Sequence, residues 1–207
     1  MLMGGFMKEE LIKLKNEIVF VTSNKGKVAS AQERLDDIKL EIFNYDLIEP
    51  RSDDVKVIAE SKVRQAYEVV KKPCIALDAG FYINALNGFP RAFVNFALDT
   101  LGIDGILKQM NDVDDRRCAF KECLAYFDGE HILYFNGNHE GTLSTEIRGN
   151  DTDKKWSDLW YIFIPYGYTK TLAQMTDEER KNRIICPQNI SCMDEFSNYH
   201  EKTKKMI

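Results

Sequence analysis

The chain has 207 residues, with 28 Lys or Arg against 33 Asp or Glu, so its formal charge is −5. Hydrophobic residues make up 44% and aromatic residues 11%, which excludes an intrinsically disordered protein because there is ample surface to bury. The mild acidity argues against nucleic-acid binding by bulk charge, and no apolar run approaches the ~18 residues of a membrane span. Since the start also lacks a signal-peptide pattern, we expect a cytoplasmic protein without nucleic-acid or membrane partners.

Strand and helix patterns alternate over the first 80 residues. Residues 18–22 (IVFVT) form a continuous β-branched and aromatic run, typical of a strand buried on both faces. A polar turn leads into a helical stripe over 28–35, and residues 38–42 alternate like a half-buried strand. Residues 52–54 (SDD) mark the start of a helix whose apolar stripe runs over 55–70.

Strand patterns dominate from residue 74 to about 165. We predict strands over 74–78 and 81–86, a helix over 103–110, a hairpin of 118–127 with 132–137, and a later helix over 176–183. This order predicts an α/β fold with a mixed sheet, arranged as two lobes around a central cleft. Because no linker separates the parts, residues 1–207 are expected to form one domain.

The cysteines and histidines show no metal-binding pattern. Three histidines, at positions 131, 139 and 200, are scattered, and the five cysteines contain no CxxC pair. We expect reduced, mostly buried thiols rather than structural zinc or a disulfide framework.

The first candidate binding site is the turn that follows the strand at 18–22. It reads TSNKGK and leads into a helix N-terminus, where free backbone N–H groups and the helix dipole attract anions. The side chains of Thr22, Ser23 and Asn24 add donors, and Lys27 adds a cation, so phosphate is the natural ligand. The alternative is that Ser23 or Asn24 merely caps the helix.

A pair of carboxylates, Glu49 and Asp78, is the second candidate. Asp78 ends an apolar strand pattern and precedes Ala79 and Gly80, where a backbone without bulky side chains lets a ligand approach. Glu49 lies between a strand and a helix, at what would be the same sheet edge. Two carboxylates there would hold Mg²⁺, which prefers oxygen ligands and shares them with substrate phosphates. The alternative is a turn-forming Asp78 and a solvated Glu49.

Basic residues are the third element. Lys62 interrupts the apolar side of the helix over 55–70, so it is either an inward-pointing phosphate ligand or a lysine that snorkels at the helix edge. Lys181, without further context, would be assigned to the surface. The pairs Arg116-Arg117 and Lys154-Lys155 are expected to be solvated charge.

Together these segments resemble one known family. The matching motifs occur in one order: TSNKGK (22–27), LIEP (47–50), ALDAGF (76–81), NALNGFP (84–90), FNGNHEG (135–141), IFIPYGYTKTLAQM (162–175) and EERKN (178–182). From about residue 18 to 183 the chain resembles the inosine triphosphate pyrophosphatases, the non-canonical purine nucleoside triphosphate pyrophosphatases, whereas the last 20 or so residues match poorly. The resemblance implies a long twisted mixed sheet flanked by helices, a homodimer, Mg²⁺ dependence, and cleavage of a nucleoside triphosphate to its monophosphate and pyrophosphate.

The resemblance also implies roles by position. The positions that match the family's phosphate loop and triphosphate-contacting lysines are Thr22, Asn24, Lys27, Lys62 and Lys181. Glu49 matches the metal-associated glutamate, and Asp78 matches the second aspartate of a D-D-[ST]-G motif, which either activates water or binds metal. Since an unperturbed aspartate has a pKa near ~3.9, Asp78 is expected to be ionised at pH 7.

The chain departs from the family in the motifs that read the base. D-D-[ST]-G becomes LDAG at 77–80, the motif before IFIP is replaced by residues 156–161, and Ser-His-Arg aligns with residues 185–187. Trp156, Trp160 or Tyr161 either stacks on a base or belongs to the core. We therefore predict cleavage of a non-canonical purine nucleotide such as ITP, XTP or dITP. The alternatives are a shifted or relaxed base preference, or a nucleotide-binding protein that has lost catalysis.

Overall fold

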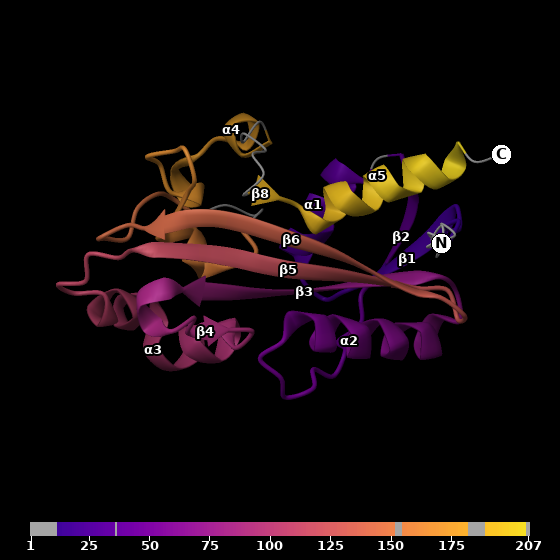
Figure 1. Ribbon diagram of the computed structural model, residues 1–207, viewed down its shortest axis with the longest axis horizontal. Coiled ribbons are helices and arrows are strands. Elements are labelled where there is room, and N and C mark those ends of the chain that lie inside the picture. The colour runs from indigo at the N-terminus through magenta and orange to yellow at the C-terminus, as the bar shows by residue number, and fades with distance from the viewer. Residues whose placement is uncertain (1–11, 36, 152–154, 182–188, 206–207) are drawn as a thin grey trace, which may run out of the picture.

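The computed structural model describes residues 12–35, 37–151, 155–181 and 189–205. Its helices are α1 (Lys25–Arg34), α2 (Val55–Val70), α3 (Val94–Gln109), α4 (Asp177–Lys181) and α5 (Cys192–Lys204). Its strands are β1 (Glu17–Val21), β2 (Lys39–Phe43), β3 (Cys74–Ile83), β4 (Pro90–Arg91), β5 (Arg117–Phe127), β6 (Ile132–Leu143), β7 (Phe163–Pro165) and β8 (Asn189–Ile190). The long strands β3, β5 and β6 run along most of the molecule (Figure 1).

Among the described residues, eight strands form one mixed sheet. Its order is β2-β1-β3-β5-β6-β7, with β4 paired to β3 and β8 paired to β6. The pairs of β1 with β2 and with β3 are parallel, and the remaining pairs are antiparallel. The parallel part comes from the strand–helix alternation of the first 80 residues, and the antiparallel part comes from the hairpin that follows. The predicted mixed α/β sheet is therefore confirmed.

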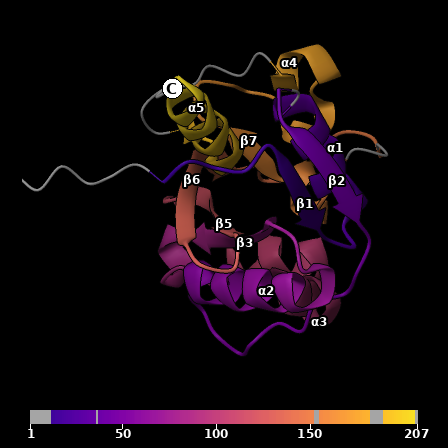
Figure 2. The ribbon, with the colours of Figure 1, turned by 90° about the vertical axis from the view of Figure 1, so that its right-hand side faces the viewer.

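Helices cover both faces of this sheet. In Figures 1 and 2, α2 and α3 lie below the long strands, whereas α1 and α5 lie above them. Apolar clusters fill the end near β1, with Phe20 and Phe196 on the α5 side and Val63 and Ala125 on the α2 side. A separate cluster around Phe163 fills the other end. The long strands thus join two halves, as the predicted two lobes require.

Helix caps and the hairpin turn follow the sequence signals. Asp54 caps α2, because its Oδ1 accepts a hydrogen bond from the Lys56 backbone N–H at 2.8 Å. In the β5–β6 turn, Asp128 Oδ1 accepts from the N–H groups of Glu130 and His131 at 3.0 and 2.7 Å, and Gly129 takes a positive φ of 98°. The predicted hairpin is confirmed, although β6 continues six residues further, to Leu143.

The strand that carries Asp78 is longer than the sequence predicts. Residues 74–78 and 81–86 do not form two strands, because β3 continues through Ala79 and Gly80 and pairs with β5 from Cys74 to Ile83. Asp78 therefore lies in mid-strand rather than at a strand end. A Cβ at Gly80 would lie 2.7 Å from the carbonyl oxygen of Arg91, so this glycine admits the backbone of β4.

The helix predicted over 103–110 is present as the second segment of α3, because Gly102, with φ 65° and ψ 179°, is not helical and divides α3 in two. The first segment, which begins at Val94, is not predicted by the sequence pattern. The predictions for two charged residues need correction. Arg116 is not solvated charge: its guanidinium donates to the carbonyls of Met110, Leu143 and Ser144 at 2.6–3.0 Å. Lys155 is not fully solvated either, because its Nζ lies 2.8 Å from Oδ1 of both Asp151 and Asp158. Arg117 is exposed as predicted, and Lys154 lies outside the described residues.

The four described cysteines are buried and free, as expected, and Cys186 lies outside the described residues. Burial raises the pKa of the Cys74 and Cys123 thiols to about 12, so both stay protonated at neutral pH. No helix in the described part of the chain has the length and apolar character needed to cross a membrane.

Candidate active site

The predicted phosphate loop connects β1 to α1. Asn24 Oδ1 accepts from the Lys27 backbone N–H at 3.0 Å, and Thr22 Oγ1 accepts from the Asn24 N–H at 3.2 Å. The capping alternative thus holds for Asn24, while Ser23 is exposed at the turn. A Cβ at Gly26 would lie 2.6 Å from the Cβ of Trp156, so the loop packs directly on this tryptophan.

Lys62 of α2 joins the two predicted carboxylates. Its Nζ lies 2.7 Å from Glu49 Oε1 and 3.3 Å from Asp78 Oδ1. The side chain of Lys62 is 12% exposed and that of Asp78 only 7%, whereas Glu49 remains 54% exposed. Lys62 therefore points inward, as one of its two interpretations predicted, and the structure brings Glu49 and Asp78 to one place.

Burial and neighbouring charges shift the pKa values of this cluster. Burial raises the pKa of the Asp78 carboxyl above its ordinary value, and the charge of Glu49 adds to this, against the opposing charges of Lys27 and Lys62. Asp78 is thus not the unperturbed aspartate that the sequence alone predicted. Burial acts to lower the pKa of Lys62, but Asp78 and Glu49 outweigh it and raise the value. Burial, together with the charge of Lys62, lowers the pKa of Lys27.

An unpaired stretch of β3 connects the two faces of the sheet. On this edge β3 pairs with β1 only at Cys74 and Ile75, and with β4 only at Phe81 and Tyr82. Among the described residues, no strand covers positions 76–80 from this side. Lys27 reaches this edge and donates from Nζ to the Leu77 carbonyl at 3.1 Å. Since successive side chains of a strand point to opposite faces, Asp78 faces α2 while its neighbours Leu77 and Ala79 face the other way.

A pocket of about 340 Å³ lies on the face opposite Asp78. Its wall includes Lys27 from the phosphate loop, together with Leu77, Phe120, Trp156, Trp160 and Leu172. Trp156 packs edge-to-face on Phe120 with ring centroids 4.7 Å apart, and Trp160 is only 6% exposed. Both tryptophans therefore belong to the core and also line the pocket, so the two interpretations of these residues are compatible.

Two polar residues that the sequence reasoning did not select also line this pocket. Glu122 of β5 and His139 of β6 form a pair, with Nε2 of the imidazole 3.2 Å from Oε1 of the carboxylate. Burial acts to raise the pKa of Glu122, but His139 and the backbone N–H of Cys192 lower it to about 2. The period-2 pattern of β5 contained the signal, since a charge occupies an otherwise apolar face.

Charged residues from α1, α4 and α5 form the pocket rim. Arg34 pairs with Asp194 through two contacts of 2.7 and 2.8 Å. Arg180 lies over the Trp160 ring, 5.3 Å from its centroid, and donates to the Leu172 carbonyl at 3.0 Å. Lys181 is the last residue of α4, whereas residues 185–187, the predicted counterpart of the base-reading motif, lie outside the described residues.

The carboxylates at Lys62 fit a magnesium ion that takes few protein ligands. Mg²⁺ is commonly held by one or two carboxylates plus substrate phosphates and water. Glu49 and Asp78 both contact the same ammonium group, so their oxygens converge, and they are hard ligands of the preferred kind. In the described part of the chain no group of three or more His, Cys, Asp or Glu forms a complete metal cage. The donor set therefore fits a site that the substrate completes.

The fold and this site define an α/β protein with a charged cluster and a pocket on opposite faces of one long strand. Comparison with known proteins gives the family: the model of the Ham1 family matches residues 18–185. The chain belongs to the Ham1 family, which confirms the resemblance found in the sequence.

Named relatives and solved structures agree with this assignment. The "dITP/XTP pyrophosphatase" of Thermococcus kodakarensis is 34% identical, covering 91% of this chain and 99% of the relative. The "Inosine triphosphate pyrophosphatase" of Yarrowia lipolytica is 31% identical, covering 81% of this chain and 87% of the relative. A HAM1 protein from Coxiella burnetii has the same fold, with a TM-score of 0.75 at 24% identity, covering 91% of this chain and 100% of that one.

Proposed function

We propose that the chain hydrolyses a non-canonical purine nucleoside triphosphate, such as ITP, XTP or dITP, to the monophosphate and pyrophosphate. Membership of the Ham1 family and the names of its relatives support this activity. The observation that carries the proposal is the buried Lys62, which joins Glu49 and Asp78 beside the phosphate loop. Such a cluster places cations and a proton acceptor where a triphosphate would react.

The charged residues divide the work of the reaction. The N-terminus of α1, with Thr22, Ser23 and Asn24, would receive phosphate oxygens, while Lys27 and Lys62 offset their charge. Lys181 is proposed as a further triphosphate contact from its match to the family motif. These groups would hold the α-phosphorus in line with the attacking water.

Asp78 is proposed as the group that activates this water. A water oxygen forms a bond to the α-phosphorus while the bond from that phosphorus to the bridging oxygen breaks, and pyrophosphate leaves with the electron pair. The proton of the water passes to the Asp78 carboxylate. Because burial raises the pKa of Asp78, it is a stronger proton acceptor than an ordinary aspartate.

Magnesium dependence is part of the proposal. Glu49 and Asp78 are the residues that would hold Mg²⁺, and the bound ion would offset the negative charge of the triphosphate. Chelation by EDTA is expected to abolish pyrophosphate release, and added Mg²⁺ to restore it. Full activity in EDTA would remove the metal from the proposal.

The pocket is proposed as the site of the base. Lys27 belongs to the phosphate loop and also lines the pocket. A nucleotide whose phosphates lie on the loop would therefore extend its base into the pocket. Trp156, Trp160 and Phe120 offer aromatic surface for a planar ring. Its volume of about 340 Å³ lies within the range of small-molecule sites.

We further propose that the protein is a cytoplasmic homodimer of a chain that forms one domain. Apolar side chains are exposed on α3 and on the turn before it, at Phe89, Phe93, Phe96 and Leu101. A second copy would cover them. Light scattering is expected to give twice the mass of one chain, and a monomeric mass would contradict the dimer.

A second candidate is a nucleotide-binding protein without catalysis. The observation that favours it is that Leu77 and Ala79 replace an acid and a hydroxyl on the pocket side of β3. Such a protein would show nucleotide-dependent thermal stabilisation without turnover.

The test is pyrophosphate release with Mg²⁺ across ITP, XTP, dITP and the common nucleotides, with Asp78→Asn as the blank. Turnover of ITP, XTP or dITP above the common nucleotides supports the proposal. Turnover of other bases alone would retain the chemistry and overturn the substrate. Binding without any turnover would favour the second candidate.

A further inference from the structure

Glu122 breaks an otherwise apolar face of β5. Residues of alternate parity point to the same side of a strand, and on this side Phe120, Leu124 and Tyr126 are all at most 2% exposed. Glu122 lies between them and lines the pocket. Burial of a carboxylate on an apolar wall destabilises the fold unless the carboxylate is hydrogen-bonded, so Glu122 is expected to have hydrogen-bond donors beside it.

Two neighbouring elements, β6 and α5, hold this carboxylate in place. Its Oε1 accepts a hydrogen bond from the Cys192 backbone N–H at 3.0 Å, and His139 Nε2 lies 3.2 Å from the same oxygen. An ionised carboxylate only accepts hydrogen bonds, so Nε2 of His139 carries a proton. A side chain at Gly137 would collide with the Glu122 side chain, so this glycine provides the space. Residues of β6 and α5 therefore fix one orientation of Glu122.

These contacts leave Oε2 able to accept from a ligand, because each oxygen of a carboxylate accepts more than one hydrogen bond. Among the described residues, His139 Nε2 and the Cys192 backbone N–H both contact Oε1. The Cys192 thiol is also hydrogen-bonded to this carboxylate and helps to lower its pKa. The Glu122 side chain is 14% exposed, and it lines the same pocket as Trp156 and Trp160. A ligand in this pocket therefore meets a fixed negative acceptor among aromatic rings.

We propose that Glu122, positioned by His139, selects the base: Oε2 accepts a hydrogen bond from a ring N–H of an uncharged purine such as hypoxanthine. This inference rests on the proposed pyrophosphatase function, and it names a group that distinguishes hypoxanthine from adenine and from xanthine. Adenine in the same position would direct a ring nitrogen lone pair at the carboxylate. Xanthine, whose additional acidic N–H makes it largely anionic near neutral pH, would be repelled by it.

The predicted order is therefore ITP above both XTP and ATP. A site built to receive a donor discriminates strongly against an analogue that lacks it, because the buried acceptor is left unpaired. Glutamine at position 122 presents either an oxygen or an NH₂ group, and it carries no charge. Glu122→Gln should thus accept all three bases more equally.

The experiment measures kcat/KM for pyrophosphate release from ITP, XTP and ATP in wild type and Glu122→Gln. We expect both ratios, ITP over ATP and ITP over XTP, to fall by about tenfold or more in the variant. The ratios do not depend on the fraction of folded enzyme, so partial unfolding does not obscure them. Glu122→Asp, which keeps the charge but retracts it, should lower the ITP/ATP ratio while still disfavouring XTP.

Matched variants separate base selection from general effects. Glu130→Gln removes the same charge in the β5–β6 turn, where the Glu130 side chain is exposed, and should leave both ratios unchanged. For the positioning role, His139→Ala should lower the ITP/ATP ratio, and His139→Gln, which retains a donor, should restore part of it. Equal ratios in the two His139 variants would contradict that role.

The remaining outcomes separate the role of Glu122 from the proposed pyrophosphatase function. Wild-type turnover with ratios unchanged in Glu122→Gln would overturn the role of Glu122 and leave the proposed function intact. A wild type that prefers XTP or ATP over ITP would overturn it as well. No pyrophosphate from any nucleotide would instead overturn the proposed function on which this inference rests.

Discussion

Charged side chains are paired differently on the two faces of the sheet. On the α2 face, Asp78 and Glu49 share the ammonium group of Lys62, so the anions and cations largely offset one another. On the pocket face, Glu122 is held by His139 and by Cys192, and the contacts from His139 Nε2 and the Cys192 backbone N–H both end on Oε1. Under the proposed function, the first region would serve the reaction and the second would select the base. Variants in one region should therefore leave the property of the other unchanged.

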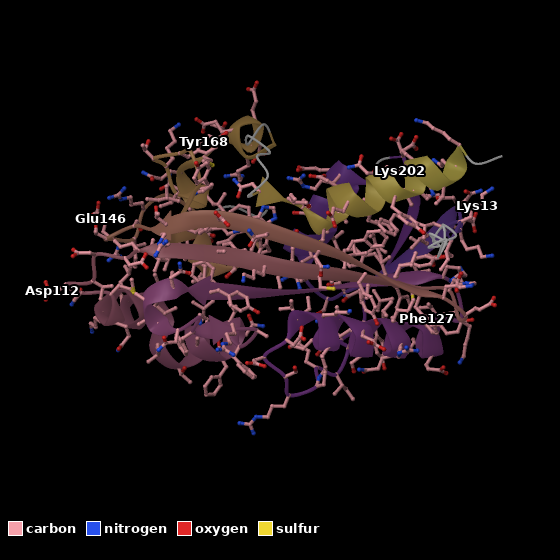
Figure 3. The ribbon with its side chains drawn as sticks, in the orientation of Figure 1. Lys13, Asp112, Phe127, Glu146, Tyr168 and Lys202 are labelled. Atoms are coloured by element: carbon pink, nitrogen blue, oxygen red, sulfur yellow. The ribbon has the colours of Figure 1, made fainter. Side chains whose placement is uncertain are left out.

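The largest effect is expected for Asp78→Asn. Removal of a general base typically costs 10²–10⁴ in rate, and we expect about a thousandfold loss of kcat. The control is Asp112→Asn, at an exposed position at the opposite end from Phe127 (Figure 3), where the positive φ of 58° is compatible with asparagine. Wild-type activity in Asp78→Asn would refute its role and with it the division between the two faces.

Lys62→Met should have the next largest effect. Loss of one cation that stabilises the transition state costs about a hundredfold in kcat, and methionine keeps much of the apolar stem. The ITP/ATP ratio should remain that of wild type, because Lys62 lies on the face opposite the pocket. A changed ratio at unchanged kcat would reverse the assignment of the two regions.

The stability effect of Glu122→Gln should depend on pH. The folded-state pKa of Glu122 is lowered to about 2 from an ordinary value of 4.5, so its charge stabilises the fold above about pH 4.5. This contribution is lost as the pH falls towards 2. We expect Glu122→Gln to lower the free energy of unfolding at pH 7 by on the order of 2 kcal/mol. Urea melts at pH 7, 4 and 3 should show the difference shrinking, and a constant difference would contradict the ionised carboxylate.

The smallest effect is expected at the pocket rim. The Arg34–Asp194 pair is partly exposed, with side chains 25% and 28% accessible, so it is worth at most about 1 kcal/mol. Arg34→Gln should lower Tm by no more than about 4 °C and leave both base ratios unchanged. A large change in either ratio would show that the rim, and not only Glu122, selects the base.

The sequence predicted the charged cluster around Lys62 better than the pocket. TSNKGK, the inward Lys62 and the paired Glu49 and Asp78 were visible because each depends on local pattern: a strand followed by a helix N-terminus, or a charge on an apolar stripe. The continuous β3 was not predicted, since Ala79 and Gly80 resemble a turn. Only the pairing with β5, more than 40 residues away, shows that they continue a strand.

The pocket depends on contacts that no local pattern contains. Glu122 and His139 are 17 residues apart and meet only because the β5–β6 register places Phe120 opposite His139. The sequence alone does not single out His139, because scattered histidines lack a zinc pattern. Arg116 was expected in solvent because arginine usually lies there, yet it binds three backbone carbonyls. These contacts form only in the tertiary structure, so they cannot be predicted from local sequence patterns.

The N–H group that steadies Glu122 belongs to Cys192, beyond residue 185 where the match to the family model ends. This wall of the pocket is therefore built partly by a portion of the described chain that the family model does not cover. A shift in the start of α5 by a single residue would rotate that donor away and change the orientation of the carboxylate. Under the proposed role of Glu122, substitutions in the C-terminal helix would alter ligand choice without any change in the residues that the family model covers.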